Sequence, residues 1–307
     1  MGTYVVRRLL QMIPVLIGST FLIFVMVFAL PGDPVAGRCG ERACPPAYVA
    51  AFTKEYHLDQ PVLVQYALYF GRLMRGDLGT NFFGNSVAGE LAARFPTTIR
   101  LALIAILFEI IVGIGAGVWA GIRRNRWPDT LVTLSSLLII SVPIFVLGAL
   151  AQLVFGVRLG WFPVTSTQGT WEQLLLPGLV LGSVSVAYVA RLTRTNLVEN
   201  LRADYVRTAK AKGLGRGRSV GIHTLRNSLI PVVTYIGADF GALMGGAIVT
   251  ERIFNVNGIG SFIFRSITQR DGVSVVGSVV CLVLVFLIMN LLVDLLYGVL
   301  DPRISHE

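Results

Sequence analysis

Val275–Leu300 reads VVGSVVCLVLVFLIMNLLVDLLYGVL and carries a single charged side chain, Asp294. About 20 consecutive, mostly apolar residues are enough for a helix to cross the hydrocarbon core of a bilayer, so this stretch predicts a transmembrane helix. Five other stretches are also strongly apolar: Leu9–Leu30, Leu101–Ala120, Leu131–Phe155, Leu174–Ala190 and Leu229–Val249. The shortest of them is Leu174–Ala190. The sequence therefore predicts an all-α membrane protein with six transmembrane helices.

The composition agrees with this fold class. Asp, Glu, Lys and Arg together make up 14% of the 307 residues, whereas they make up about a quarter of a soluble domain. A formal net charge of +9 would suggest a nucleic-acid partner for a soluble protein. In a membrane protein the positions of the basic residues matter more, because cytoplasmic loops collect Lys and Arg. We therefore expect a lipid bilayer around this chain and no nucleic acid.

The basic residues also predict the orientation of the chain. They gather before the first predicted span, in the short loop after the second, and throughout the 191–226 loop. This pattern places both termini and the 191–226 loop in the cytoplasm, and the 31–97 and 251–273 segments outside. The chain then divides into residues 1–93, a transmembrane helix with an extracytoplasmic segment, and residues 94–301, a transmembrane core that contains the 191–226 loop.

The 31–97 segment contains two local features. Asp59-Gln60-Pro61 is a helix-start signal, and apolar residues recur at helical spacing from Val62 to Leu73. Cys39 and Cys44 lie close together in the chain. Outside the membrane they could form a short-loop disulfide, and two free thiols are the alternative.

Glycines four residues apart follow one face of two predicted spans. Small residues at this spacing let helix backbones approach closely, which is how helices associate in lipid. The second span carries Gly113, Gly117 and Gly121, and the fifth carries Gly237, Gly241 and Gly245. These stripes predict a tightly packed bundle with a partner, either a second copy or a homologous subunit.

Two carboxylates fall deep inside predicted spans, Glu109 and Asp239. A charged side chain at this depth is costly, so each is expected to face protein or water instead of lipid. Asp239 lies two residues from Gly237 and Gly241, about 200° around a helix, and therefore points away from the glycine stripe. We expect Asp239 to face a translocation pathway, with Glu251 as a second candidate; a structural hydrogen bond to a neighbouring helix is the alternative for Asp239.

No catalytic constellation stands out in the sequence. The histidines are scattered and no Cys–His grouping has zinc spacing, so no metal site is expected. A P-loop needs Gly-Lys-Ser/Thr after a Gly-rich turn, and none of Lys54, Lys210 and Lys212 follows a glycine. The chain is therefore not expected to be an enzyme by itself.

The 191–226 loop contains the most informative order of residues. Leu201–Lys212 lacks helix breakers and Gly213 follows as a natural stop, which predicts a short helix. By charge alone, this segment would be a basic region attracted to anionic lipid. However, Asp204-Tyr205-Val206-Arg207-Thr208-Ala209-Lys210-Ala211-Lys212-Gly213, with Leu225-Arg226-Asn227 and Ile230-Pro231 beyond it, resembles the EAA loop of binding-protein-dependent ABC importer permeases.

This resemblance is to the oligopeptide/dipeptide/nickel branch and covers nearly the whole chain. The other motifs that carry it are Tyr4–Leu10, Leu30–Pro34, Arg75–Gly79, Arg94–Thr98, Glu251–Asn255, Gly258–Gly260 and Leu300–Arg303. It implies the type I ABC importer transmembrane fold for the core. It also implies that the first half of the loop, with Asp204 and Tyr205, is the coupling helix that sits in a groove of the ATPase subunit.

Carried over by position, Arg207, Thr208 and Ala209 occupy the Glu-Ala-Ala places of the motif, and Gly213 is the motif glycine. Arg207 replaces the acidic residue of the pattern, so a contact that needs a carboxylate is not expected there.

The resemblance also implies the partners of the chain. These are a homologous second permease subunit, two ABC ATPase subunits that bind ATP and Mg, and an extracytoplasmic substrate-binding protein, all at a bacterial plasma (cytoplasmic) membrane. The implied substrate is a dipeptide or oligopeptide, although similar permeases move nickel, glutathione or sugars. A proton-coupled secondary transporter that uses Asp239 is the alternative from another class, and it would need no ATPase.

Overall fold

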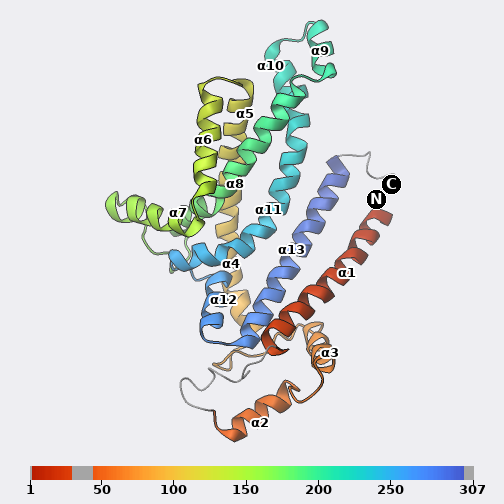
Figure 1. Cartoon of the computed structure of the whole chain (residues 1–307), viewed down its shortest axis with the longest axis vertical. Helices are drawn as coiled ribbons and strands as arrows, with labels where there is room; N and C mark the ends of the chain where they lie inside the picture. The colour runs from red at the N-terminus through yellow and green to blue at the C-terminus, as the bar shows by residue number, and fades with distance from the viewer. Residues whose placement is uncertain (1, 30–43, 301–307) are drawn as a thin grey trace. The chain divides into compact units, whose positions relative to one another are not determined.

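The computed structural model describes residues 2–29 and 44–300. This part of the chain is built from helices joined by turns (Figure 1). The α-helices are α1 (Gly2–Phe24), α2 (Pro46–Glu55), α3 (Val62–Leu73), α4 (Val87–Phe108), α5 (Gly115–Ile122), α6 (Trp127–Ser141), α7 (Ile144–Ala151), α8 (Trp171–Asn200), α9 (Asp204–Ala211), α10 (Arg216–Arg218), α11 (Leu225–Ile253), α12 (Ile259–Thr268) and α13 (Gly272–Leu300). Four π-helical segments interrupt or extend them: η1 (Val25–Ala29), η2 (Glu109–Ile114), η3 (Gln152–Arg158) and η4 (Ser219–Thr224).

Five continuous helical runs are long and apolar enough to cross a membrane. They are Val6–Phe28, Val87–Ile122, Trp171–Asn200, Ser219–Gly245 and Gly272–Leu295. These runs confirm five of the six predicted spans, because each contains most of one predicted apolar stretch. The orientation of the termini stays a prediction.

The remaining predicted span, Leu131–Phe155, is not one straight helix. The run breaks between Ser141 and Ile144, and its two halves are bent by 102°. The cause is Pro143, whose ring disfavours helical geometry in the preceding residue; Val142 accordingly adopts φ −99° and ψ 127°. Six spans result only if this bent pair counts as one.

The chain divides into two compact units, which are described separately. Unit 1 comprises Met1–Thr98 and Asn257–Ile288, and unit 2 comprises Ile99–Val256 and Met289–Glu307.

Unit 1 has an aromatic core between α1, α3 and α13. Phe24 and Tyr69 are buried there with Val276 and Val280. α3 begins at Val62, directly after Pro61, so the helix-start signal in the sequence is confirmed.

Unit 2 is organised around α8, which contacts α5, α6, α11 and η2 (Figure 1). Glycines allow the closest approaches: a Cβ added at Gly182 would lie 2.8 Å from the carbonyl oxygen of Ala105. An ion pair ties α8 to α6, with Arg194 donating two hydrogen bonds of 2.9 and 2.8 Å to the carboxylate of Asp129. α8 is therefore held by α4 at its middle and by α6 in its C-terminal part.

Candidate functional site

The first candidate site is α9, the short helix in the 191–226 loop. The structure begins it at Asp204 and not at the predicted Leu201, because α8 ends with a tight turn. In that turn the backbone N–H of Arg202 donates to Glu199 and that of Ala203 donates to Asn200, each only three residues back. Figure 1 shows α9 as a separate helix at one end of unit 2, with α10 beside it.

Gly213 ends α9 as a left-handed cap. Its φ is +80°, a conformation that costs glycine little and other residues more. The backbone N–H of Leu214 donates to the carbonyl of Ala209 over 3.1 Å, which is the long hydrogen bond of a Schellman motif. α9 therefore has a fixed length and a defined end.

Two contacts hold α9 against the rest of unit 2. The side chain of Val206 is fully buried, and the hydroxyl of Tyr205 donates a 2.9 Å hydrogen bond to the side-chain oxygen of Asn200 at the end of α8. The remaining face is exposed and includes Arg207 and Thr208. The 3.5 Å ion pair between Arg207 and Asp204 is exposed on both sides, so it contributes little stability and leaves both groups available to a partner.

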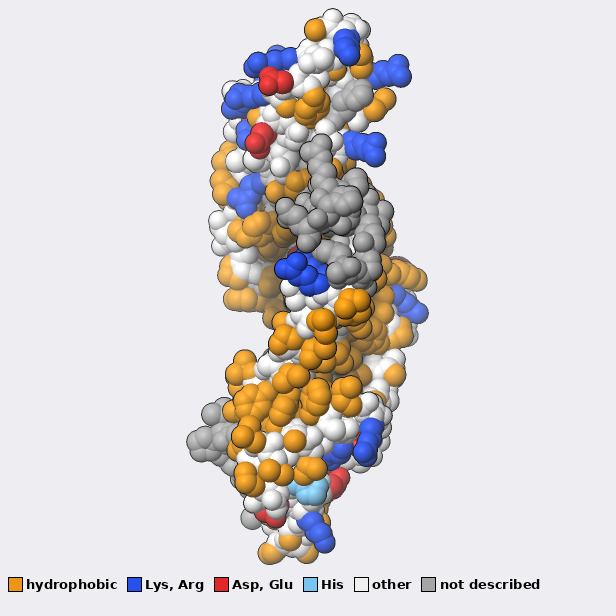
Figure 2. Space-filling model, turned by 90° about the vertical axis from the view of Figure 1, so that its right-hand side faces the viewer, with side chains coloured by type: hydrophobic (Ala, Val, Ile, Leu, Met, Phe, Trp, Pro, Cys, Tyr) orange, Lys and Arg blue, Asp and Glu red, His pale blue; other side chains and the backbone are white. Residues whose placement is uncertain are grey.

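The surroundings of α9 are strongly basic. Lys and Arg side chains gather over the end of unit 2 that carries α9 (Figure 2). A partner that binds this end therefore needs a surface that tolerates or complements positive charge.

The second candidate site is a pair of carboxyl groups at membrane depth. Glu109 in η2 and Asp239 in α11 face each other, with Ser185 of α8 and Tyr235 of α11 beside them. Glu109 is fully buried, and neither of its carboxylate oxygens has a hydrogen-bond donor among the described residues. Ionisable groups inside a membrane are costly, and a cluster of this kind marks a candidate functional site.

From the sequence, we expected Asp239 and not Glu109 to face a translocation pathway. The structure brings the two together, and an orientation argument from a single helix could not show that contact. Glu251, the other pathway candidate, is fully buried near the end of α11. Whether any of these residues lines a pathway stays a prediction.

The glycines of the two stripes lie in different environments. A Cβ at Gly113 would lie 2.8 Å from Val189, and one at Gly117 would lie 2.5 Å from the carbonyl oxygen of Ala190, so both face α8. In α11, Gly237 meets Val293 of α13 at 2.5 Å and Gly241 is buried, whereas Gly245 has open space. Close packing inside the chain thus occupies most of these positions.

The two remaining predictions concern cysteines and metals. Cys39 lies outside the described residues, so the Cys39–Cys44 disulfide stays a prediction. Within residues 2–29 and 44–300, no three His, Cys, Asp or Glu residues lie close enough together to hold a metal ion.

Comparison with known families gives two matches that follow one another along the chain. Residues 1–102 match the N-terminal part of the membrane components of binding-protein-dependent transport systems. Residues 113–306 match the family described as binding-protein-dependent transport system inner membrane component.

Individual relatives match over their full length. The chain is 40% identical to the dipeptide transport system permease protein DppB of Alkalihalophilus pseudofirmus, with 100% of both chains covered. It is 39% identical to the glutathione transport system permease protein GsiC of Escherichia coli K12, and 38% identical to GsiC of Salmonella typhimurium, again with 100% of both chains covered.

Proposed function

The chain belongs to the family of binding-protein-dependent transport system inner membrane components, and from that premise we propose that it forms part of the translocation pathway for short peptides. As a member of this family it is a permease component located in the inner membrane. Its relatives are permease proteins, not enzymes by themselves.

The observation that supports a peptide substrate is the full-length similarity to permeases named for dipeptides and for glutathione, which is itself a short peptide. Both relatives match at nearly the same identity. The proposal therefore names a short peptide of two or three residues and leaves dipeptide and glutathione as its two versions.

We propose further that α9 couples this chain to an ATPase subunit. The support is its geometry: it is a capped helix with an exposed outer face, held at the end of unit 2 by Val206 and Tyr205. The partners would be a homologous second permease, two ATPases that bind ATP and Mg, and a substrate-binding protein on the opposite side of the membrane.

Such a contact has a direct route into unit 2. α9 follows α8 after three residues and contacts η4, which leads into α11. α8 and α11 in turn carry Ser185, Tyr235 and Asp239. A displacement of α9 would therefore move the two helices that surround the acidic pair, which is how closure of an ATPase dimer could change access to the pathway.

The coupling proposal is tested by crosslinking. A chain with Tyr205→Cys is reconstituted with candidate ATPase subunits and treated with a bifunctional thiol reagent. We expect a specific crosslink from Tyr205→Cys that is lost when Ala209→Pro breaks the helix. A chain with Thr165→Cys, in the loop that precedes the other end of α8 and exposed there, is the matched control and should give none. Equal crosslinking from both positions would reject the assignment.

The substrate is tested by uptake into vesicles that contain the reconstituted system. We expect ATP-dependent uptake of a labelled dipeptide or of glutathione, and no uptake of nickel or sugar. Uptake that continues without ATP, responds to ionophores and is lost in Asp239→Asn would instead indicate a proton-coupled secondary transporter, which the acidic pair would then serve.

A further inference from the structure

An arginine-lined cavity lies at the end of unit 2 where α5 turns into α6. It has a volume of about 520 Å³ and is open at the surface of the molecule. Arg123, Arg124 and Arg126 contribute from the turn between α5 and α6, and Arg202 contributes from the turn between α8 and α9. Two separate parts of the chain thus line one space with arginines, and we call this space the arginine pocket.

Within the described part of the chain, the charges of the arginine pocket are not neutralised by carboxylates. Among the described residues, none of the four arginines forms an ion pair. The nearby carboxylate of Asp129 is already taken by two hydrogen bonds from Arg194, which is not a pocket residue. The Nε of Arg124 is buried and has no hydrogen-bond partner. A buried donor without an acceptor is unfavourable, so an acceptor that reached this N–H would be stabilised there.

Two tryptophans that flank the lining residues along the chain indicate where the arginine pocket lies relative to the membrane. Trp119 near the end of α5 and Trp127 at the start of α6 pack edge to face, with ring centroids 5.0 Å apart, and both are exposed. Exposed tryptophans at the end of a membrane span are typical of the level of the lipid headgroups. Ile122, also exposed, lines the same pocket. The pocket therefore combines cationic walls with an apolar rim at the membrane surface.

We propose that the arginine pocket binds the headgroup phosphate of an anionic phospholipid, with the acyl chains lying outward over Ile122. Guanidinium groups bind phosphate through paired, charge-assisted hydrogen bonds. Basic pockets between transmembrane helices are suited to such headgroups. A soluble anion would use the same guanidinium groups but would gain nothing from the apolar rim or the tryptophans.

Occupancy of this pocket would affect α9. Arg202 lies in the three-residue turn that connects α8 to α9, so a phosphate held between Arg202 and the α5–α6 turn would tie the base of α9 to two other elements. Lipid composition would then alter how firmly α9 is held. This consequence is independent of which substrate the chain moves.

The test uses the fluorescence of the two tryptophans beside the pocket. The full chain, with Trp161→Phe and Trp171→Phe to remove the other two tryptophans, is placed in nanodiscs of a zwitterionic lipid. Brominated phosphatidylglycerol or brominated phosphatidylcholine is then titrated in as the quencher. We expect phosphatidylglycerol to quench at much lower mole fraction.

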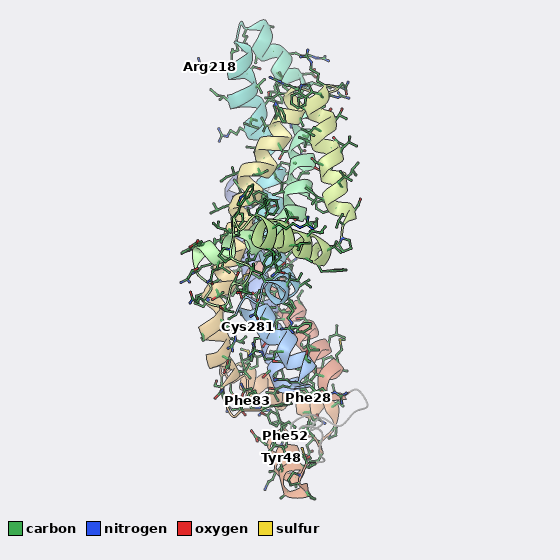
Figure 3. The ribbon with its side chains drawn as sticks, turned by 90° about the vertical axis from the view of Figure 1, so that its left-hand side faces the viewer. Phe28, Tyr48, Phe52, Phe83, Arg218 and Cys281 are labelled. Atoms are coloured by element: carbon green, nitrogen blue, oxygen red, sulfur yellow. The ribbon has the colours of Figure 1, made fainter. Side chains whose placement is uncertain are left out.

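Variants distinguish lipid binding in the arginine pocket from a general attraction between basic residues and anionic lipid. One basic residue near an anionic surface changes the affinity about fivefold, so Arg202→Gln should weaken the preference for phosphatidylglycerol about fivefold and Arg124→Gln with Arg126→Gln roughly 30-fold. Arg218→Gln is the matched control. Arg218 is an exposed arginine of α10 at the same end of unit 2, labelled in Figure 3, and it does not line the pocket. It should leave the preference unchanged.

Three outcomes would overturn the proposal. The first is equal quenching by the two brominated lipids. The second is displacement of the lipid by inorganic phosphate alone, which would make the pocket a site for a soluble anion. The third is loss of lipid, detected by native mass spectrometry, when ATPase subunits join the complex, which would make the pocket part of that protein contact.

Discussion

Two membrane spans of this chain, α8 and the run from Val6 to Phe28, differ in an instructive way. Within the most apolar window of each, 67% of the α8 residues are buried inside the molecule, against 11% of those in the N-terminal run. The more buried span is nevertheless the less apolar of the two. Apolar character therefore does not determine how much of a span is buried inside the molecule.

The physical reason for this difference is that lipid, and not water, surrounds the helices. Lipid tails are as apolar as leucine, so a leucine gains little when it leaves lipid for protein, and close packing decides which helices associate. α8 supplies Gly178 and Gly182 to its neighbours and receives Gly113, Gly117 and Gly121 from them. In contrast, the N-terminal run presents large apolar residues such as Leu10 and Leu22 outward.

The sharpest test of this comparison adds a side chain at a close contact. Gly117→Leu would place its Cβ 2.5 Å from the carbonyl oxygen of Ala190 and from Thr193. We expect it to lower the free energy of unfolding by about 3 kcal/mol, or to prevent folding. Gly115→Leu, two residues away with nothing within 4 Å, is the control and should fold normally in a detergent thermal-unfolding assay. Equal loss in both variants would mean that the contact with α8 does not matter.

A second test makes the same substitution in both spans. Leu197 of α8 is fully buried against Gly121, whereas Leu22 of α1 is 60% exposed. We expect Leu197→Ala to cost about 2 kcal/mol because it leaves a cavity, and Leu22→Ala to change stability by less than about 0.5 kcal/mol. Denaturant unfolding in mixed micelles measures both, and a larger effect at Leu22 would contradict the comparison.

A third test removes the ion pair that links α8 to α6. In Asp129→Asn the two charge-assisted hydrogen bonds from Arg194 are weakened, at a cost of about 1.5 kcal/mol, since Arg194 is partly exposed to solvent. A double-mutant cycle with Arg194→Gln isolates this energy. A coupling energy near zero would show that the glycine contacts alone hold α8 in place.

The smallest effect is expected where α8 gives way to α9. Gly213→Ala forces a residue with a Cβ into φ +80° and should cost about 1 kcal/mol of local stability. Hydrogen exchange of the α9 amides measures it, because the effect should be confined to that helix. Gly215→Ala is the control, since Gly215 has no positive φ and nothing within 4 Å; exchange that rises equally in both variants would argue against the cap.

Apolar length predicted most of the fold, because the bilayer thickness alone sets the length of a spanning helix. Five spans could be predicted from apolar length, and the start of α3 could be predicted from the local signal at Pro61. The 102° bend at Pro143 was also present in the sequence as a Val-Pro pair, but a count of apolar residues does not register a single backbone restriction.

The candidate site was less predictable. Gly213 could be assigned as a stop because its effect is local, and the structure confirms that α9 ends there. The contact between Glu109 and Asp239, and the convergence of Arg202 with the α5–α6 turn, depend on how helices far apart in sequence rotate and pack. No periodicity within one helix encodes that information.

The contact of Gly117 with α8 also has a genetic consequence. Every amino acid that a single nucleotide change can substitute for glycine carries a Cβ, so no missense variant reachable in one step fits beside the carbonyl oxygen of Ala190. This codon would tolerate only synonymous changes unless α8 changed as well. A saturation library should therefore show a sharp depletion at Gly117 and a broad spectrum of survivors at Gly115.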